Sequence, residues 1–396
     1  MKLYTSKKDT AASRTVIADD MMLTKDMPTA AGSKMLDGYM SLFEAEVLTK
    51  LNAAGYSIGG KADVGEFAAD LLGETSYNGA PVADGKLVSA AAQILKTDDV
   101  LAVVGLDVNG SIRRSAAQSG LVSVKPTYGT VSRYGTIPVA CSGETVSVMA
   151  KNTDDCREVL EAIIGHDDKD GTSLSDELCA KLKKSSGAEA VRRVAIVTEL
   201  TADMDADTKA KLENAKAKLA ANGIEIAEIS EKSFAAARIA WNILMSAELC
   251  NNVSRYDGVK YGYRTENYTN IDELYTNTRT EAFGELLKTT ILFGSDALST
   301  DNYMKVYDKA MRIRRVVKEA FDTIFAQYDA ILAPACSKAA YTEADVAADK
   351  YLAFTENLCT APASITGLPT VVAGGVQLIG KAFSENALFD AAKLYE

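Results

Sequence analysis

The sequence predicts an α/β fold, in which strands alternate with helices along most of the chain. Residues 100–104 form a continuous apolar run, which is typical of a strand buried on both faces of a sheet. Residues 41–54 instead place apolar side chains three and four positions apart, as one face of a helix requires. A strand over 193–197 followed by a helix over 206–221 repeats this order.

The remaining elements continue the alternation without a repeat or a Gly/Ser- or Pro-rich linker, so we expect residues 1–396 to form one domain. Gly55 is the expected C-cap of the first helix, and Thr153 or Asp154 the expected N-cap of a helix over 153–164. Residues 173–187 are polar and low in bulk, which predicts a surface excursion. Further strands are expected over 56–61, 224–229 and 328–334, and further helices over 87–96, 233–255, 271–297 and 302–326.

Composition excludes several classes of function. The 43 basic and 54 acidic residues give a net charge of −11, which opposes strong direct binding to nucleic acid. The chain lacks the apolar run of about 18 residues that crosses a bilayer and the apolar core of a signal peptide, so we expect a cytoplasmic protein with no membrane partner. Six scattered cysteines without a CxxC pair predict neither a disulfide framework nor a metal site, and no cofactor is expected.

Residues 105–117 follow the strand predicted at 100–104 and have the pattern of a loop that presents a nucleophile, with Ser111 at its tip. Gly110 precedes this serine and Arg113 follows it. A serine hydroxyl becomes nucleophilic only where a neighbouring base takes its proton. The single histidine, His166, lies in a polar segment typical of a surface turn, so we do not expect a Ser–His–Asp triad.

Several segments resemble the amidase-signature family, and most closely its glutamyl-tRNA(Gln)/aspartyl-tRNA(Asn) amidotransferase A subunits. The resemblance runs from about residue 15 to the C-terminus, and it implies a central mixed, twisted β-sheet covered by helices on both faces. Because the chain starts close to the family's base segment, we expect the family's N-terminal helical region to be mostly absent. The matching segments are 110–117, 124–135, 163–170, 255–264, 274–279, 367–369 and 375–381.

Members of this family use a lysine that acts through a cis-bonded serine to deprotonate the nucleophilic serine. The resemblance places Ser111 at the nucleophile, and the backbone amides of Val108, Asn109, Gly110 and Ser111 at the loop that holds the oxyanion. Asn109 stands where the family usually has glycine. Because Asn tolerates a left-handed backbone better than most residues, we expect the loop to keep its shape.

The other two members of the triad do not match. Asp19 falls at the position of the family's lysine, and Lys25 lies six residues beyond it. The cis-bonded serine corresponds to Leu87 when residues are counted back from Ser111 without gaps, and to Gly85 when residues 89–92 are aligned instead. Neither residue carries a hydroxyl. Ser89, the nearest serine, is expected to be a helix N-cap.

Substrate recognition is changed as well. The resemblance places Arg314 at the arginine that holds the α-carboxylate of glutamine, with a solvent-exposed helix charge as the alternative interpretation. It places Asn357 at the aspartate that holds the α-ammonium group, so the paired charge is lost. Tyr263, in the matching segment 255–264, is a further residue expected to contact substrate.

Three hypotheses follow. The first is a catalytically inactive relative that serves as a binding or regulatory subunit, with a partner similar to an amidotransferase B or A subunit. The second is an active glutamine amidohydrolase or amidotransferase subunit that uses Ser111, which requires Lys25 or Lys86 near the serine as a replacement base. The third is a sensor that binds a small amide or amino acid without cleaving it.

Overall fold

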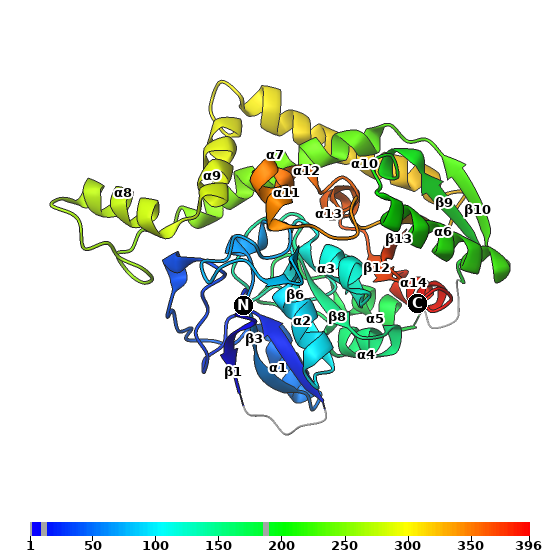
Figure 1. The fold of residues 1–396 in the computed structure, drawn as a ribbon, viewed down its shortest axis with the longest axis horizontal. Coiled ribbons are helices and arrows are strands. Elements are labelled where there is room, and N and C mark those ends of the chain that lie inside the picture. The colour runs from blue at the N-terminus through cyan, green and yellow to red at the C-terminus, as the bar shows by residue number, and fades with distance from the viewer. Residues whose placement is uncertain (1, 9–13, 185–189) are drawn as a thin grey trace.

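The computed structural model describes residues 2–8, 14–184 and 190–396, and its centre is a mixed sheet of eleven strands (Figure 1). The sheet contains both parallel and antiparallel pairs, which confirms the predicted α/β class with a mixed sheet. In sheet order the strands are β1 (Tyr4–Lys7), β3 (Ser57–Ala62), β2 (Thr15–Asp19), β6 (Ala102–Asp107), β8 (Thr145–Ala150), β7 (Val122–Lys125), β12 (Thr370–Ala373), β13 (Val376–Gly380), β11 (Ala330–Pro334), β9 (Arg193–Val197) and β10 (Glu225–Ile229).

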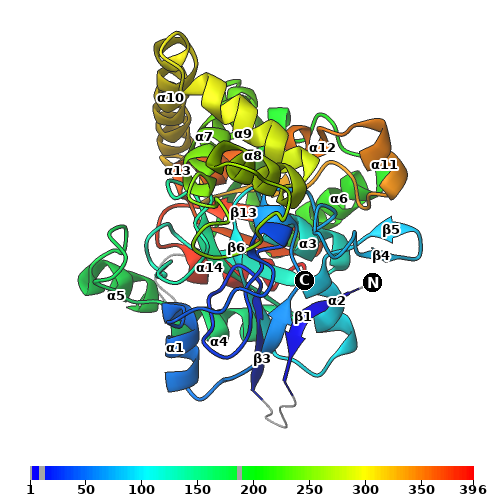
Figure 2. The same ribbon diagram turned by 90° about the vertical axis from the view of Figure 1, so that its left-hand side faces the viewer.

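The α-helices lie between these strands in the sequence, and a two-stranded hairpin of β4 (Val82–Ala83) and β5 (Lys86–Leu87) stands apart from the sheet (Figure 2). Figure 1 shows α8 extending away from the body of the molecule. The helices are α1 (Glu46–Ala53), α2 (Ala90–Thr97), α3 (Ser111–Ser119), α4 (Thr153–Ile163), α5 (Asp176–Lys184), α6 (Ala206–Ala221), α7 (Ser233–Val253), α8 (Ile271–Ala282), α9 (Glu285–Ala297), α10 (Asp308–Phe325), α11 (Glu343–Ala348), α12 (Leu352–Thr355), α13 (Ala361–Thr366) and α14 (Glu385–Ala392).

Both faces of the sheet are buried under helices. Alternate residues of β2 point into two different apolar clusters, since Val16 and Ala18 belong to one and Ile17 to the other. The first cluster contains apolar side chains of α1 and α4, and the second contains those of α2 and α3. The central strands can therefore be apolar along their whole length.

Several elements differ from the sequence-based expectation at their ends. The first helix begins at Glu46 rather than near residue 41, because the Ser41 hydroxyl accepts the Phe43 N–H at 3.2 Å and forms a local turn. The helix expected over 87–96 begins at Ala90 with Ser89 as its N-cap, as predicted for that serine. The N-cap of α4 is Asn152, so both predicted N-caps, Thr153 and Asp154, are wrong by one and two residues.

Two larger differences concern residues 173–187 and 271–297. The first range contains helix α5, in which Cys179 and Leu182 are buried, and its residues 185–187 lie outside the described part of the chain. The second range is divided into α8 and α9 because the Gly284 N–H donates to Glu66 Oε2 at 2.9 Å instead of to the helix. Within the described residues, no helix is long and apolar enough to cross a membrane.

Candidate active site

The topology brings Asp19 and Ser111 to the same edge of the sheet. β2 and β6 are parallel neighbours, with Ala18 opposite Val104 in the register. Asp19 is the last residue of β2, and Ser111 opens the helix that follows β6. Carboxyl ends of adjacent parallel strands form the crevice in which α/β proteins place their functional groups. The sequence-based assignment therefore refers to one place in the fold.

Gly110 gives the turn before Ser111 its shape. Its φ of 89° lies in the left-handed region, and a Cβ there would lie 2.5 Å from the Cβ of Thr360. Asn109 does not adopt the left-handed conformation that asparagine tolerates, since its φ is not positive. Glycine at 110 performs this task, so Asn109 needs no unusual backbone.

A buried ion pair between Arg113 and Asp107 holds the loop that precedes Ser111. The Arg113 guanidinium donates to both carboxylate oxygens of Asp107, at 3.0 and 2.8 Å, and also to the Thr360 carbonyl and the Ser364 hydroxyl. Burial opposes ionisation of Asp107, but the Arg113 charge lowers its pKa below the usual value. Asp107 also accepts the Gly110 N–H at 3.1 Å, so one amide expected to hold an oxyanion is already occupied.

Asp19 is a buried carboxyl fixed by backbone amides. Its Oδ2 accepts the Leu106 N–H at 2.7 Å and its Oδ1 accepts the Met21 N–H at 3.1 Å. Burial raises its pKa to about 7, although these two hydrogen bonds favour the charged form. Asp19, which the sequence analysis predicts at the family's lysine position, is therefore an acid with a pKa near neutral pH.

Lys61 is a buried lysine close to this segment that the sequence reasoning did not single out. It lies on β3, beside β2, and its ammonium group contacts Asp20 Oδ1 at 3.0 Å. The same nitrogen donates to the Pro28 carbonyl at 2.9 Å and to Thr29 Oγ1 at 2.6 Å. All three N–H donors thus have acceptors, and burial lowers the pKa of Lys61.

A small cavity of about 30 Å³ lies beside Ser111. That volume accommodates one or two water molecules and is far below the roughly 300–1,000 Å³ of typical ligand pockets. Within the described residues, no hydrogen bond to the Ser111 hydroxyl is present, and no lysine, arginine or histidine lines the cavity. The polar side chains around it are those of Asp19, Asp63, Asp70, Ser89, Ser111 and Ser115.

Hydrogen bonds between asparagine side chains join the loop before Ser111 to α7 and to the segment that follows α12. The Asn357 amide nitrogen donates to Asn109 Oδ1 and to Asn242 Oδ1, both at 2.7 Å. The Asn109 amide in turn donates to the Ala353 carbonyl at 3.0 Å. These hydrogen bonds hold Asn357, which was expected at a substrate-binding position, against the loop before Ser111. A glycine at position 109 would have no side chain to accept the hydrogen bond from Asn357.

The two positions considered for the cis-bonded serine lie in the β4–β5 hairpin. Gly85 has a φ of 73° in the turn, and Leu87 is buried in the second apolar cluster. Leu87 donates its N–H to the Tyr341 carbonyl at 2.8 Å. Ser89, the N-cap of α2, is the serine of this segment that lines the cavity.

Four further candidates do not line the cavity beside Ser111. The Tyr263 hydroxyl donates to Glu281 at 2.6 Å. The Lys34 ammonium nitrogen lies 4.0 Å from the centroid of the Tyr263 ring, in a cation–π contact. The lysines proposed as replacement bases, Lys25 and Lys86, are both exposed. Arg314 donates to the Ser142 carbonyl at 3.1 Å instead of to a carboxylate.

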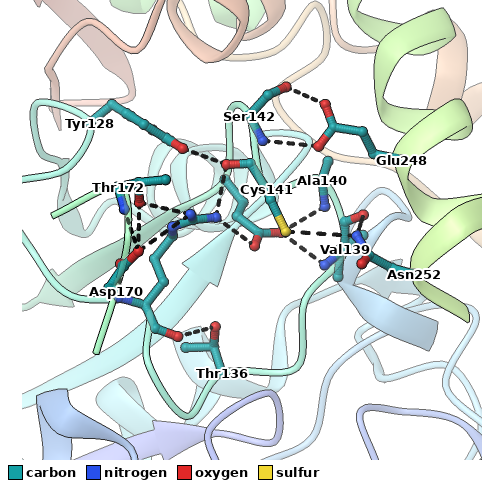
Figure 3. Close-up of polar contacts among 12 residues, drawn as sticks. Tyr128, Thr136, Val139, Ala140, Cys141, Ser142, Asp170, Thr172, Glu248 and Asn252 are labelled. Atoms are coloured by element: carbon teal, nitrogen blue, oxygen red, sulfur yellow. Dashed lines mark hydrogen bonds and ion pairs between the residues drawn. The ribbon is translucent and has the colours of Figure 1, made fainter. Parts of the chain in front are cut away.

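Figure 3 shows the network that holds the segment around Ser142. The Arg133 guanidinium donates to Glu144 Oε1 at 3.0 Å and to the Cys141 carbonyl at 2.8 Å. Glu248 of α7 accepts both the backbone N–H and the hydroxyl of Ser142. These hydrogen bonds hold the segment whose Ser142 carbonyl accepts the hydrogen bond from Arg314.

A comparison with known proteins identifies the family. A sequence model of the amidase family matches residues 18–85 and 89–389. This chain belongs to the amidase family. It is 35% identical over 398 residues to the glutamyl-tRNA(Gln) amidotransferase A subunit of Acinetobacter baumannii, covering 95% of this chain and 80% of that protein. The corresponding protein of Latilactobacillus sakei is 33% identical over 395 residues, with 95% and 81% covered.

Solved structures of the amidase family have the same fold. The A subunit of glutamyl-tRNA(Gln) amidotransferase from Thermotoga maritima superimposes with a TM-score of 0.80 at 25% identity, covering 99% of this chain and 86% of that one. The family match omits residues 86–88, so Leu87 falls in the gap and Gly85 is the last residue before it. The interruption coincides with the β4–β5 hairpin, which contains both positions that the resemblance aligns with the cis-bonded serine.

No metal site accompanies the serine. Among the side chains that the structure describes, no three His, Cys, Asp or Glu groups are arranged to hold a metal ion. His166 is exposed, and its ring nitrogens contact Asp168 Oδ1 and the Leu174 carbonyl, both at 3.0 Å.

Proposed function

We propose that this amidase-family protein does not hydrolyse amides and acts as a binding or regulatory subunit. The observation that carries the proposal is the cavity beside Ser111, whose titratable lining consists of Asp19, Asp63 and Asp70. Burial raises the pKa values of Asp19 and Asp63 to about 7 and about 6. A site of this composition offers no cationic side chain to the oxyanion that forms when a serine attacks an amide.

The residues near the position where the family has its basic lysine support the proposal. Asp19 is shorter than lysine, and both of its oxygens accept backbone N–H groups, which hold the carboxylate in place. The buried Lys61 forms an ion pair with Asp20, donates hydrogen bonds to the Pro28 carbonyl and the Thr29 hydroxyl, and is not among the cavity residues. Loss of one triad member typically costs serine hydrolases about 10⁴-fold in rate.

The space for substrate supports it as well. The cavity of about 30 Å³ is too small for an amino acid amide. The Asn357 side chain, predicted at a substrate-binding position, is engaged by hydrogen bonds to Asn109 and Asn242. The Gly110 N–H is engaged by Asp107. Both the ligand volume and the oxyanion donors that hydrolysis requires are therefore reduced.

Ammonia release from glutamine, asparagine and simple neutral amides tests the proposal. We expect the native protein and Ser111→Ala to give the same rates, equal to the buffer rate. Ser115→Ala is the matched control, because Ser115 lines the same cavity one helical turn later. Turnover, or labelling by a fluorophosphonate, that is lost in Ser111→Ala and retained in Ser115→Ala would overturn the proposal.

One observation favours a second candidate, which is a hydrolase that uses Asp19 as its base. Asp19 and Ser111 line the same cavity, which has room for a bridging water, and burial raises the pKa of Asp19 to about 7. Such an enzyme would become active as the pH rises through about 7, where the carboxylate forms. Asp19→Asn would then abolish both the activity and its pH dependence.

The binding role has its own test. The relatives are named as A subunits of an amidotransferase, which supports a partner similar to an amidotransferase B or A subunit. Sedimentation velocity of this chain mixed with such proteins from the same genome is expected to give a faster-sedimenting complex. A protein that sediments alone in every mixture, while glutamine or asparagine raises its melting temperature, would favour the sensor hypothesis instead.

A further inference from the structure

A second pocket lies apart from the candidate active site. It is bordered by residues 23–43, residues 134–138 and residues 255–261, the last of which follow α7. None of its lining residues lines the cavity beside Ser111. Its volume is about 300 Å³, at the lower end of the roughly 300–1,000 Å³ of small-molecule sites. A ligand with one or two rings therefore has enough room.

Five aromatic rings line this pocket. Phe43 and Tyr134 are stacked, with their ring centroids 5.2 Å apart. The Tyr261 ring contacts Tyr39, with 5.5 Å between the centroids, and meets Tyr256 edge-on at 6.2 Å. Aromatic side chains offer a large apolar area and prefer offset or edge-on contact with further rings. The lining thus favours a ligand whose body is aromatic.

The tyrosine hydroxyls in the lining are available to a ligand. The Tyr256 side chain is only 4% exposed, and within the described part of the chain its hydroxyl forms no hydrogen bond. Burial raises the pKa of this hydroxyl above its usual value, so it stays a donor at neutral pH. The other lining hydroxyls without a hydrogen bond to a described residue are those of Tyr39, Tyr134 and Tyr261. A buried phenol of this kind gains a hydrogen bond only from water or a ligand.

Arg255 is the one charged side chain that lines the pocket. Its Nε donates to the Asn252 carbonyl at 2.8 Å, and a terminal nitrogen donates to Asn252 Oδ1 at 3.1 Å. Asn252 is itself held by a hydrogen bond of 3.0 Å to the Val139 carbonyl (Figure 3). A guanidinium has five N–H donors, so three remain, and no carboxylate among the described residues pairs with them. The Arg255 charge also acts on the Tyr256 hydroxyl, whose pKa it lowers against the effect of burial.

We infer that this pocket binds a small aromatic monocarboxylate. The carboxylate accepts hydrogen bonds from the Arg255 guanidinium and the Tyr256 hydroxyl, and the ligand rings lie against Phe43 and Tyr134. Hydrogen bonds from a guanidinium to a carboxylate are the strong, charge-assisted kind. The inference does not depend on whether Ser111 is reactive, because the serine makes none of these contacts.

The same lining selects against other ligand classes. An amino acid carries an ammonium group, and the pocket has no acidic side chain to pair with it, so its burial would be costly. A neutral amide would leave the Arg255 guanidinium without a charged partner. A phosphate dianion would meet a single cation. The ligand is therefore expected to carry one negative charge and no positive charge.

Isothermal titration calorimetry with 2-naphthoate tests the inference in the full-length protein and in Ser111→Ala. We expect one molecule of 2-naphthoate to bind each chain, with equal affinity in both proteins. The neutral isostere 2-naphthamide should bind Ser111→Ala at least tenfold more weakly, and an excess of glutamine should not compete. Absence of 2-naphthoate binding would overturn the inference, as would equal affinities for the acid and the amide or displacement by glutamine.

Substitutions of charged and hydroxyl groups locate the carboxylate. Arg255→Gln should weaken 2-naphthoate binding by roughly tenfold or more, and it should remove the preference for the acid over the amide. Arg264→Gln is the matched control, because Arg264 is exposed in the same segment and does not line the pocket. Tyr256→Phe removes only the hydroxyl and should weaken binding by roughly fivefold.

A second matched pair locates the aromatic body of the ligand. Phe43 lines the pocket and is 38% exposed, whereas its neighbour Leu42 is 92% exposed and does not line it. Phe43→Ala should weaken binding by roughly tenfold, the loss expected for removing a ring from an apolar contact, and Leu42→Ala should leave it unchanged. Native affinity in both Arg255→Gln and Phe43→Ala would refute the assignment.

Discussion

Replacing Asp19 by Asn changes how the stability of the protein depends on pH. Asp19 is buried, and burial raises its pKa to about 7 in the folded protein. The pKa of an unfolded aspartate is about 3.9. Because the folded pKa is the higher one, the folded state keeps its proton over a pH range in which the unfolded state has lost it. Stability from this group therefore falls as the pH rises from about 4 to about 7, and stays low above that range.

The size of the effect follows from the linkage relation. Each pH unit between the two pKa values changes the free energy of unfolding by about 1.4 kcal/mol. Raising the pH from 5.5 to 8 crosses about 1.5 units of this range, which corresponds to a loss of about 2 kcal/mol. In Asp19→Asn this contribution vanishes, because the amide does not titrate. The amide nitrogen also cannot accept one of the two backbone N–H groups, which costs about 1–3 kcal/mol at every pH.

Urea unfolding at pH 5.5 and pH 8, at equal ionic strength, measures both terms. We expect the native protein to lose about 2 kcal/mol more than Asp19→Asn between these pH values. The other buried carboxyls titrate in both proteins, so the comparison isolates Asp19. Asp99→Asn is the control, since Asp99 is exposed and should leave the pH dependence unchanged. An identical pH dependence in the native protein and Asp19→Asn would refute the reasoning.

Three further substitutions test the packing around the site. Arg113→Ala leaves the aspartate that it pairs with buried and unpaired, so chemical denaturation should show a loss of about 3–5 kcal/mol; a loss below 1 kcal/mol would contradict the pairing. A Cβ at Gly65 would overlap the Asp70 carboxylate, so Gly65→Ala should lower the melting temperature clearly, whereas Gly171→Ala, with open space around it, should not. Asn357→Asp replaces two donated hydrogen bonds with a buried negative charge, so differential scanning calorimetry should show a loss of about 2–4 kcal/mol, and an unchanged melting temperature would exclude that network.

Local sequence signals predicted most element types correctly. The helix over 206–221 and the strand over 193–197 have the predicted bounds, because their periodicity is undisturbed by neighbours. The sequence reasoning placed no element at the strands β2, β7 and β8. The break between α8 and α9 was also missed, because it depends on a hydrogen bond from Gly284 to the distant Glu66.

Some residues of the candidate site could also be placed from the sequence, whereas others could not. Ser111 and Asp19 could be placed together from sequence because each matched a family segment, and parallel strands β2 and β6 bring both to one sheet edge. The assignment of Leu87 or Gly85 could not be resolved, since the hairpin that contains them interrupts the family match. Arg314 and Tyr263 were assigned by resemblance, and the structure places neither at the cavity beside Ser111.

The sequence by itself determined the family and the α/β class, and it predicted that Asp19 occupies the position of the family's lysine. These properties reside in local periodicity and in short matching segments, which do not depend on how distant parts of the chain meet. Only the tertiary structure decided that the cavity beside Ser111 is small and lined by carboxylates, that Lys61 pairs with Asp20, and that Arg255 and five aromatic rings line a second pocket. Cavity volume, burial and the pKa shifts that follow from burial arise from contacts between residues far apart in the chain, so no local pattern carries them.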